Sequence, residues 1–309
     1  MTILVDNKVF HIVNHSIGNK RVAVLLAAWS GIRWIEDQVI SILSQVGPRL
    51  DLFISVDFSF DGTYEWCKSL SSKFSNVSVL PYGEGFGGAA RNFFRLIRDV
   101  DFSHYDYVAL SDQDDLWFDN KLARAIAQIE SSQSDAFSSD VVAFWEDNKK
   151  NVLLKKSFPQ RKFDYFFESA GPGCTYILRR DTMQEFKQFL IYNWDSVNQV
   201  KLHDWMIYAF CRSRSKSWHI DAEPLMLYRQ HNDNQFGANF GIKQLIARLS
   251  LIKSKWYRNE VEKIVALVDP YKQSGFSLEN SFLIKNCWQL RRRSRDAWIL
   301  FIILILGIF

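Results

Sequence analysis

The sequence predicts an α/β fold built on a doubly wound, mostly parallel sheet, followed by a helical C-terminal extension. The first observation is that apolar runs without polar alternation, typical of strands buried on both faces, recur between residues 21 and 110. The second is that a segment with apolar residues at helical spacing follows most of these runs. Strands that alternate with helices are joined by right-handed crossovers, which give a parallel sheet with helices on both faces.

Each expected element follows from this pattern. Buried strands are expected at 21–29, 50–56, 77–80 and 105–110, with further strands at 141–144 and 175–178. Helices are expected at 35–45, 89–97, 120–130, 202–211 and 242–267, with another that starts at Asp61 as its N-cap. Because ligands of such sheets bind beyond the carboxyl ends of the strands, the site is expected at that edge.

Composition narrows the class of protein. Of the 309 residues, 48% are apolar and 23% are charged, which excludes a wholly disordered chain. The net charge of +4 is too small for a surface that binds nucleic acid, so no nucleic-acid partner is expected. The four cysteines are far apart and form no CxxC pair, which fits a reducing cytoplasm rather than a disulfide scaffold. Residues 1–10 show no secretory signal.

Three carboxylates stand at the end of the fourth expected strand: Asp112, Asp114 and Asp115. Such neighbours repel one another and their pKa values rise, unless a cation or hydrogen-bond donors neutralise them. Hard carboxylate oxygens suit Mg²⁺ or Mn²⁺, and such ions often bridge to phosphate oxygens. A solvated acidic turn is the commoner explanation for an isolated cluster. The strand-end position, with Asp57 at the end of the second strand, favours a metal and nucleotide site.

Four blocks of the sequence resemble glycosyltransferase family 2, in particular its bacterial rhamnosyltransferase-like members. They follow the family's order and together cover about residues 22–240. The blocks are EDQVISILSQ at 36–45, GGAARNF at 87–93, SDQDDLW at 111–117 with Lys121, and YRQH at 228–231 with Asn234 and Gly237. The resemblance implies a GT-A fold, an inverting mechanism and a nucleoside-diphosphate sugar donor.

The resemblance also assigns the donor side of the site. It implies that Asp57 contacts the base or ribose. It further implies that the SDQDDLW block contributes Asp112, Gln113 and Trp117 to the donor site. Arg91, just after the glycine-rich turn at 83–88, is expected near the diphosphate.

The same block supplies the expected metal site for Mg²⁺ or Mn²⁺. Asp112, Asp114 and Asp115 are expected to hold the ion, with Asp114 the foremost direct ligand. By the resemblance, His231 completes the shell. A structural histidine that bonds the backbone is an equal alternative for His231.

An acidic residue at a helix start is expected to be the catalytic base. Attack on the anomeric carbon requires the acceptor hydroxyl to lose its proton, on the face opposite the leaving diphosphate. Asp204, in LHDW at 202–205, is similar to the family's residue at that position, and His203, Trp205 and Arg229 are expected on the acceptor side. One carboxylate base without a nucleophile gives inversion. A helix N-cap is the alternative role for Asp204.

Two features depart from the family's pattern or compete with it. DFSFDGT at 57–63 has one aspartate and one glycine fewer than the family's usual DDGSTDGT, which leaves base selectivity open. The run 83–88 satisfies GxGxxG, but a dinucleotide fingerprint belongs to the first strand–helix turn and this is the third. A nicotinamide enzyme is therefore disfavoured.

The domain plan places a GT-A domain at 1–240, with a nucleotide-binding half at about 20–135 and an acceptor half at about 136–240. The extension 241–309 ends in an uncharged stretch from 297, preceded by Arg291, Arg292, Arg293 and Arg295. As a helix this tail would span about 20 Å, less than a hydrocarbon core of about 30 Å. We expect it to anchor the protein peripherally at the cytoplasmic face of the membrane, with its arginines at anionic headgroups. A buried helix or an oligomer contact is the alternative.

The expected function is transfer of L-rhamnose from dTDP-L-rhamnose to a cell-surface polysaccharide such as O-antigen, or to a polyprenyl-diphosphate-linked glycan. UDP-galactofuranose, UDP-galactose and UDP-glucose remain open as donors. A metal-dependent nucleotidyltransferase would carry a glycine-rich, lysine-containing loop after the first strand, and residues 30–33 do not offer one. A non-enzymatic glycan-binding protein is the remaining alternative, against which the intact Asp112, Asp114 and Asp204 weigh.

Overall fold

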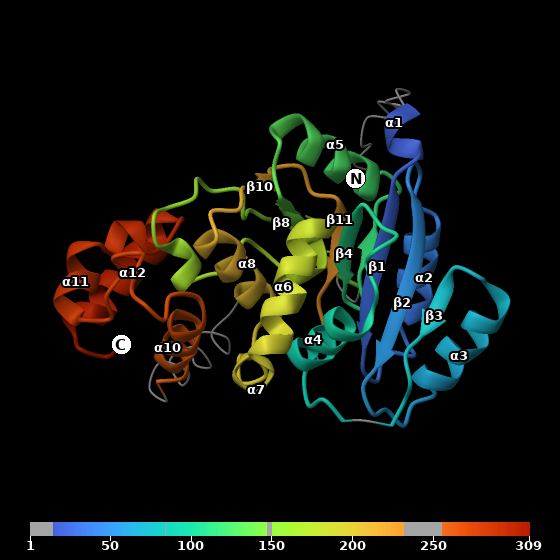
Figure 1. The fold of residues 1–309 in the computed structure, drawn as a ribbon, viewed down its shortest axis with the longest axis horizontal. Helices are drawn as coiled ribbons and strands as arrows, with labels where there is room; N and C mark the ends of the chain where they lie inside the picture. The colour runs from blue at the N-terminus through green and yellow to red at the C-terminus, as the bar shows by residue number, and fades with distance from the viewer. Residues whose placement is uncertain (1–14, 84, 147–149, 232–254) are drawn as a thin grey trace.

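A seven-stranded sheet forms the centre of the computed structural model, which describes residues 15–83, 85–146, 150–231 and 255–309 (Figure 1). The strand order is β10-β6-β9-β4-β1-β2-β3. β9 pairs antiparallel with β4 and β6, and every other pair in this sheet is parallel. The predicted doubly wound, mostly parallel sheet is therefore confirmed. Its strands are β1 (Arg21–Ala28), β2 (Arg49–Val56), β3 (Val77–Val79), β4 (Tyr107–Ser111), β6 (Ala136–Ser139), β9 (Ile177–Arg179) and β10 (Trp218–Asp221).

The alternation of side chains along β1 explains why helices cover both faces of the sheet. Ala23 and Leu25 point into a core shared with three helices, and Val22 and Val24 point into a second core on the opposite face. The first core contains α4 (Ala89–Asp99), α6 (Arg180–Tyr192) and α8 (His203–Ser213), and the second contains α2 (Ile35–Leu43), α3 (Thr63–Lys73) and α5 (Lys121–Ser132). Both faces of this uniformly apolar strand are therefore buried, as its sequence predicts.

The predicted elements agree with the structure to within a few residues at their ends. One informative difference lies at α3, which begins at Thr63 rather than at Asp61. Gly62 takes the cap position with a φ of 88°, a left-handed conformation that glycine adopts without strain. Asp61 still acts at this helix end, because its Oδ1 accepts hydrogen bonds from Thr63 N at 3.1 Å and from Thr63 Oγ1 at 2.6 Å.

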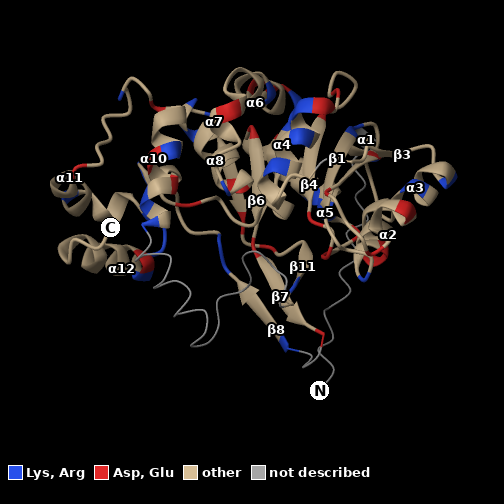
Figure 2. Cartoon of the chain, turned by 90° about the horizontal axis from the view of Figure 1, so that it is seen from below, with Lys and Arg blue, Asp and Glu red and all other residues tan. Residues whose placement is uncertain are grey.

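A second, four-stranded sheet packs beside the first, in the order β5-β11-β7-β8. Its strands are β5 (Leu116–Trp117), β7 (Val141–Trp145), β8 (Lys150–Leu154) and β11 (Met226–Arg229). β11 pairs antiparallel with β5 and parallel with β7, so residues 226–229 lie beside the end of the acidic segment. Figure 2 shows β7 and β8 extending away from the main sheet.

The C-terminal helices gather at one end of the molecule (Figures 1 and 2). They are α10 (Trp256–Val268), α11 (Asn280–Lys285) and α12 (Ser294–Ile305), with a 3₁₀ turn η3 (Cys287–Gln289). Val261, Ile264, Leu300 and Leu304 join the same core as α8, so these helices pack against the rest of the chain through one hydrophobic core. Residues 242–254 of the helix expected at 242–267 lie outside the described residues. No helix in the described part of the chain is both long enough and apolar enough to cross a bilayer.

The remaining described elements are short. They are helices α1 (His15–Gly18) and α7 (Trp194–Val197), and the 3₁₀ turns η1 (Asp164–Phe166) and η2 (Gly173–Thr175). The two 3₁₀ turns lie in the connection between β8 and β9. This connection passes close to the start of α8, because both turns make contacts with that helix.

Candidate active site

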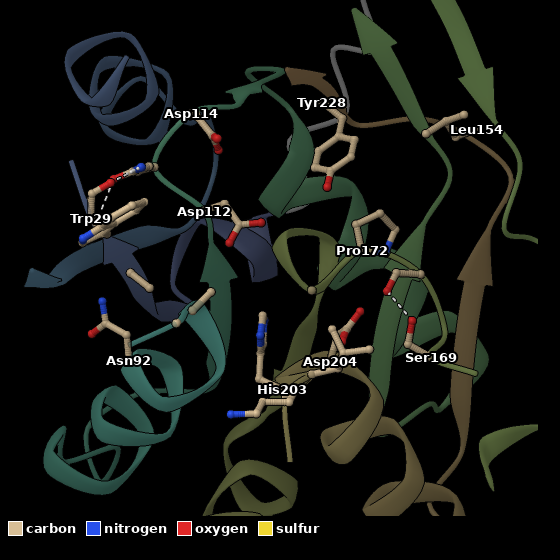
Figure 3. A pocket seen from close by; sticks show the side chains of 18 of the residues that line it. Trp29, Asn92, Asp112, Asp114, Leu154, Ser169, Pro172, His203, Asp204 and Tyr228 are labelled. Atoms are coloured by element: carbon tan, nitrogen blue, oxygen red, sulfur yellow. Dashed lines mark hydrogen bonds between the residues drawn. The ribbon is translucent and has the colours of Figure 1, made fainter. Parts of the chain in front are cut away.

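A cavity of about 1450 Å³ opens at the carboxyl ends of β1, β2 and β4, where the parallel sheet predicts a site. Residues of both halves line it. Residues 20–135, the expected nucleotide-binding half, contribute Trp29, Asp57 and residues 112–114, and residues 136–240, the expected acceptor half, contribute Ser169, residues 171–173 and the start of α8. In Figure 3 the side chains of Asp112, His203 and Asp204 point into this space.

The acidic segment after β4 divides into two parts. Asp112 and Asp114 line the cavity and are half-buried. Burial, followed by the charge of Asp114, raises the pKa of Asp112 to about 7. Asp115 is fully buried behind them, and its Oδ1 accepts a hydrogen bond from Arg229 N at 3.1 Å. Burial and the two neighbouring carboxylates raise the pKa of Asp115 well above its usual range.

His231 lies at the same wall of the cavity as the acidic segment. Its Nε2 is 2.8 Å from Asp114 Oδ2, and its ring stacks on Trp34 with 4.0 Å between centroids. The end of β11 therefore brings the histidine of the YRQH block to the SDQDD block, as the resemblance implies. Asn234 and Gly237 of the same block lie outside the described residues.

The residues around Asp112 fit a divalent cation of the hard type. Ligand atoms of Asp112, Asp115 and Cys174 lie within 4.8 Å of one another. Burial raises the pKa of the Cys174 thiol well above its usual range, so the thiol stays neutral and is a poor partner for Mg²⁺ or Mn²⁺. The buried Lys121 ammonium donates to Cys174 O at 2.7 Å and offsets part of the negative charge from behind. Carboxylate oxygens remain as the suitable ligands.

Asp204 lies in the first turn of α8, across the cavity from the acidic segment. Its Oδ1 accepts a hydrogen bond from the amide of Trp205 at 2.8 Å. Burial raises the pKa of Asp204 to about 6, against the opposing effects of the Trp205 amide, the Ser169 hydroxyl and the Lys156 ammonium. A carboxylate with a pKa just below neutrality is ionised at pH 7 and still accepts a proton readily, which is what general-base catalysis requires.

His203 precedes Asp204 and is buried against Phe93, with 4.0 Å between ring centroids. Burial lowers the pKa of His203 to about 3, so the imidazole is neutral at pH 7. Its Nε2 has no hydrogen-bond partner within the described part of the chain. Gly173 closes over this nitrogen so tightly that a Cβ at position 173 would lie 2.2 Å from it. Glycine is therefore needed at 173 for the ring to keep its place.

At the donor end, Asp57 and Gln113 hold loops together. The Asp57 carboxylate accepts hydrogen bonds from the amides of Phe58 and Phe86 at 2.7 Å and of Gly87 at 3.1 Å. It thus ties the glycine-rich turn to the end of β2. Gln113 accepts from Trp29 N and donates to Trp29 O, each at 2.7 Å, which fixes the turn after β1. Both residues line the cavity, as expected.

Five residues expected at the site do not line this cavity: Asp115 is fully buried, and Arg91, Trp117, Trp205 and Arg229 contact other parts of the fold. Arg91 turns to α7, where its Nε donates to Asn198 O at 3.1 Å. Trp117 is buried beneath Lys121, whose Nζ lies 3.6 Å from its ring centroid.

The other two are Trp205 and Arg229. Trp205 Nε1 donates to Tyr165 O at 2.9 Å inside the core. Arg229 Nε donates to Asp114 O at 2.7 Å, and its guanidinium pairs with Glu146. Trp117, Trp205 and Arg229 face inward because each satisfies a buried polar or cationic partner, whereas Arg91 is half-buried and bonds a backbone carbonyl after α7.

Other cavity residues were missed by reasoning from the sequence. Asn92 lies inside the GGAARNF block, and its Nδ2 donates to Ala28 O at 3.2 Å and to Ser55 O at 3.0 Å. An amide directly before the apolar pair Phe93 and Phe94, in the first turn of the helix, is the signal that could have identified it. Lys156 and Ser169 also line the cavity. They lie in an irregular connection with no periodic pattern, so no local signal marks them.

Comparisons with known proteins agree with this geometry. Residues 31–186 match the family model described as glycosyl transferase family 2. The chain is 42% identical over 291 residues to dTDP-rhamnosyl transferase RfbG of Shigella flexneri, a match that covers 92% of this chain and 100% of RfbG.

Solved structures share the fold. S. aureus TarS 1–349 in complex with UDP-GlcNAc has a TM-score of 0.54 at 13% identity, covering 92% of this chain and 81% of that chain. Mannosyltransferase PcManGT from Pyrobaculum calidifontis, in complex with GDP-Man and Mn²⁺, has a TM-score of 0.50 at 15% identity, covering 94% of this chain and 86% of that chain. At these identities the two structures show a common fold alone.

Proposed function

This chain belongs to glycosyltransferase family 2 and has the GT-A fold, and we propose that it transfers L-rhamnose from dTDP-L-rhamnose to a glycan acceptor with inversion. The observation that carries this proposal is that Asp112 and Asp204 face one cavity from its two halves. Similarity to a dTDP-rhamnosyl transferase over nearly the whole chain supports the donor.

On the donor side, we assign a divalent cation to the wall formed by Asp112, Asp114 and His231, all of which line the cavity. When bound, Mg²⁺ or Mn²⁺ would offset the negative charge that grows on the departing diphosphate. The Mn²⁺ in the mannosyltransferase PcManGT supports an ion of this kind. Asp115 does not line the cavity, but its carboxylate has a ligand atom within 4.8 Å of that of Asp112 and a buried Oδ2 that no described group bonds, so it can share the ion from behind while its Oδ1 supports β11.

On the acceptor side, Asp204 is proposed as the general base. The acceptor hydroxyl attacks the anomeric carbon while its proton passes to the Asp204 carboxylate, and the bond from that carbon to the diphosphate oxygen breaks on the opposite face. One displacement without a covalent intermediate inverts the configuration. The neutral His203 beside Asp204 lines the cavity without adding a positive charge next to the base.

The proposed acceptor is a cell-surface polysaccharide or a polyprenyl-diphosphate-linked glycan, met at the cytoplasmic face of the membrane. Lys156, Arg293 and Arg295 line the cavity and would attract an anionic acceptor. Next to them, α12 exposes a row of large apolar side chains suited to an interfacial position. This row consists of Trp298, Ile299, Ile302, Ile305 and Leu306.

The structure changes which arginines could serve such an anchor. Arg291 and Arg292 were expected at lipid headgroups, but Arg292 is only 5% exposed and both pair with Glu168 inside the protein. Arg293 and Arg295 are exposed and remain available. Peripheral attachment is therefore proposed through the apolar row of α12 and these two arginines.

The test of the activity is a donor panel with purified protein and a lipid-linked acceptor. dTDP-L-rhamnose, UDP-galactofuranose, UDP-galactose and UDP-glucose are each supplied with Mg²⁺, Mn²⁺ or EDTA, and the anomeric configuration of the product is read by NMR. We expect turnover with dTDP-L-rhamnose and an inverted product. Turnover confined to a UDP-sugar would reject the donor, and a retained configuration would reject the mechanism.

The test of the attachment is co-sedimentation with vesicles that contain anionic lipid. Trp298→Glu combined with Ile302→Glu should reduce the bound fraction, because both side chains are more than half exposed on α12. Tyr192→Glu, at an exposed position at the end of α6, is the matched control. Equal binding of both variants would show that α12 is not the contact.

A further inference from the structure

All lysines and arginines that line the cavity come from the acceptor half and the C-terminal helices, whereas Asp112 and Asp114 come from the nucleotide-binding half. These cations are Lys155 and Lys156 after β8, Lys201 before α8, and Arg293 and Arg295 at the start of α12. In Figure 3, Asp204 is drawn between Asp112 on one side and Leu154 and Ser169 on the other. The cavity therefore has one region suited to a metal ion and another suited to an anion.

Lys156 is held by its backbone and its aliphatic stem, while its ammonium group has no partner. Its amide donates to Asp140 Oδ1 at 2.5 Å, and a Cβ on Gly171 would lie 3.5 Å from its Cγ. The side chain is half-buried, and no residue in the described part of the chain hydrogen-bonds or pairs with its Nζ. Burial, followed by the charge of Arg292, lowers the pKa of Lys156. A bound anion would offset this cost of burying an unpaired cation.

Phe158 connects two further cations of this region. Its ring centroid lies 5.4 Å from Lys155 Nζ and 5.9 Å from Arg293 Cζ, so the two side chains meet at one ring. Neither side chain forms an ion pair with any residue that the structure describes. Arg295 differs, because its Nε pairs with Asp296 Oδ1 at 3.2 Å. We call the surface formed by Lys155, Lys156 and Arg293 the basic wall.

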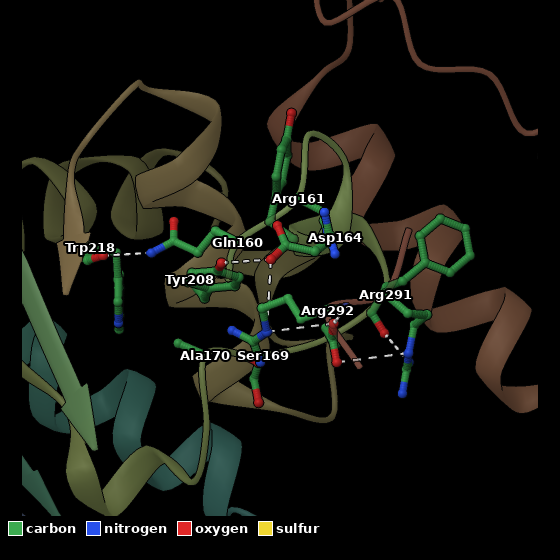
Figure 4. Close-up of polar contacts among 12 residues, drawn as sticks. Gln160, Arg161, Asp164, Ser169, Ala170, Tyr208, Trp218, Arg291 and Arg292 are labelled. Carbon is green, nitrogen blue, oxygen red and sulfur yellow. Dashed lines mark hydrogen bonds and ion pairs between the residues drawn. The ribbon is translucent and has the colours of Figure 1, made fainter. Parts of the chain in front are cut away.

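The start of α12 is tied to the connection that carries the two lysines (Figure 4). Arg292 is almost fully buried, its Nη2 donates to Ser169 O, and its backbone amide donates to Glu168 Oε1 at 2.5 Å. Ser169 itself lines the cavity. Because Arg293 directly follows Arg292, its backbone has a defined position at the cavity.

α12 joins the basic wall to an apolar surface. Arg293 directly precedes this helix, and the apolar row described above begins at Trp298. At 1.5 Å per residue, about 8 Å of helix separates the two positions. A ligand that carries a phosphate group followed by a hydrocarbon chain matches this order. A polysaccharide without a lipid would leave the apolar row without a partner.

We propose that Lys155, Lys156 and Arg293 form a phosphate-binding subsite, separate from the metal site, which holds the diphosphate of a polyprenyl-diphosphate-linked acceptor. This inference rests on the proposed function and narrows its acceptor to the lipid-linked glycan. Asp204 lines the same cavity, so the attacking hydroxyl belongs to one of the first sugars after the diphosphate. The hydrocarbon chain extends from the subsite toward the apolar row of α12.

The first experiment measures binding without any donor. Farnesyl diphosphate is titrated into the full chain in EDTA, so that no cation draws the diphosphate to the acidic segment. We expect binding that weakens by at least about tenfold in Lys156→Met and in Arg293→Met, because each loses a charge-assisted contact. Lys162→Met, exposed on the same connection and outside the cavity, is the matched control. Farnesol, which lacks the diphosphate, should bind all variants equally and more weakly.

Three outcomes would overturn the proposal. One is an equal affinity of Lys156→Met, Arg293→Met and Lys162→Met for farnesyl diphosphate. Another is an equal affinity of the wild type for farnesol and farnesyl diphosphate, which would mean that only the chain is recognised. The third is a loss of Mn²⁺-dependent dTDP binding in Lys156→Met, which would place the diphosphate of the donor on the basic wall. Arg293→Met, on another element, keeps the test decisive if Lys156→Met does not fold.

Headgroups of the bilayer carry the same phosphate chemistry, so a second experiment separates them from the acceptor. Co-sedimentation is measured with vesicles of phosphatidylglycerol and phosphatidylcholine. Lys156→Met should bind these vesicles as the wild type does, because Lys156 is not part of the attachment proposed for α12. A loss of vesicle binding in Lys156→Met would assign the basic wall to the bilayer and reject the acceptor subsite.

Transfer kinetics then separate this proposal from the proposed function. Two acceptors carry the same short glycan, one linked to an alkyl diphosphate and the other a plain alkyl glycoside. Lys156→Met should raise KM for the first by about tenfold with little change in kcat, and leave KM for the second unchanged. An equal rise of both KM values would overturn the subsite. If dTDP-L-rhamnose proves not to be the donor, the titration with farnesyl diphosphate still decides whether the subsite exists.

Discussion

His231 Nε2 lies 2.8 Å from Asp114 Oδ2, although 117 positions separate the two residues. The contact exists because β11 pairs with β5, the short strand that follows the acidic segment. This strand pairing brings the YRQH block next to the SDQDDLW block. It places the imidazole of His231 at the cavity wall to which we assign the cation. The two residues are therefore expected to act on the same bound ion.

Asp114→Ala should weaken metal-dependent binding of dTDP by at least about tenfold, because a ligand at the cavity wall is lost. His231→Ala should have an effect in the same direction. Calorimetric titration with dTDP in the presence of Mn²⁺, and again with EDTA, measures this. Asp119→Ala, exposed on the same connection, is the control. If EDTA leaves the affinity of the wild-type protein unchanged, the metal assignment is wrong.

Asp204→Asn should lower kcat by about 10²–10⁴-fold while the affinity for dTDP stays near that of the wild type. The amide keeps the size of the side chain but cannot accept the proton of the acceptor. Steady-state transfer assays and dTDP binding are measured side by side. Asp181→Asn is a suitable control, since Asp181 is exposed and pairs only locally with Arg180. Normal transfer by Asp204→Asn would remove Asp204 from the mechanism.

The rate of transfer should fall on the acid side with an apparent pKa of about 6, the value to which burial raises the pKa of Asp204. Below that pH the carboxyl carries a proton and cannot act as a base. A profile of kcat between pH 5 and pH 9, at saturating donor and Mn²⁺, tests this. The residual activity of Asp204→Asn should not show this fall of the rate on the acid side. A wild-type rate that is flat down to pH 5 would contradict the assignment.

Asp204 should also make folding stability depend on pH. Its folded pKa of about 6 lies above the value of about 3.9 for an unfolded chain. The folded protein therefore holds this proton more tightly, and the contribution of Asp204 to stability decreases as pH rises from about 4 to about 6. Asp204→Asn removes this loss. The Tm of the Asp204→Asn variant should therefore exceed that of the wild type at pH 8, and the difference should shrink at pH 5. An equal Tm at pH 8 would contradict a destabilising effect of the buried carboxylate.

Gly173→Ala should lower transfer by about a hundredfold with a smaller effect on dTDP affinity. The new Cβ would meet His203 Nε2 at 2.2 Å and push the start of α8, and a displacement near 1 Å at a reacting group has this order of cost. Kinetics and dTDP binding are compared with Gly18→Ala, where a Cβ meets nothing within 4 Å. Unchanged kinetics would show that the start of α8 adapts without loss.

Much of the nucleotide-binding half could be predicted from local pattern. The strands of that half are mostly apolar, with single polar residues such as Asp51 and Ser78, and its helices carry apolar residues at helical spacing, so the predicted elements agree with the structure to within a few residues. The positions of Asp57 and Asp112 followed, because the residue after a parallel strand must lie at the carboxyl edge of the sheet. The second sheet was not foreseen, since its strands are short and pair across long sequence distances.

The direction of individual side chains was less predictable. Trp117, Trp205, Arg91 and Arg229 all lie in motif blocks or beside the glycine-rich turn, yet none lines the cavity. A motif indicates only that a residue type is required at a position. The residue can be required because it binds a ligand or because it bonds a buried group of the protein. Arg291 and Arg292 are a second example. A basic run before an apolar tail has the same sequence pattern whether its arginines contact lipid headgroups or form buried ion pairs, and here both pair with Glu168.

The amino-acid sequence by itself determined the class of fold and the edge of the sheet at which the cavity opens, because these depend on periodicity and on residues adjacent along the chain. It also singled out Asp112 by its place after a strand and Asp204 by its resemblance to a family motif. Only the tertiary structure decided that Asp115 is fully buried while Asp112 and Asp114 line the cavity. It likewise decided that His231 meets Asp114, and that Arg292 donates to the carbonyl of Ser169. The last two contacts join residues 117 and 123 positions apart, and such contacts exist only once the whole chain has packed.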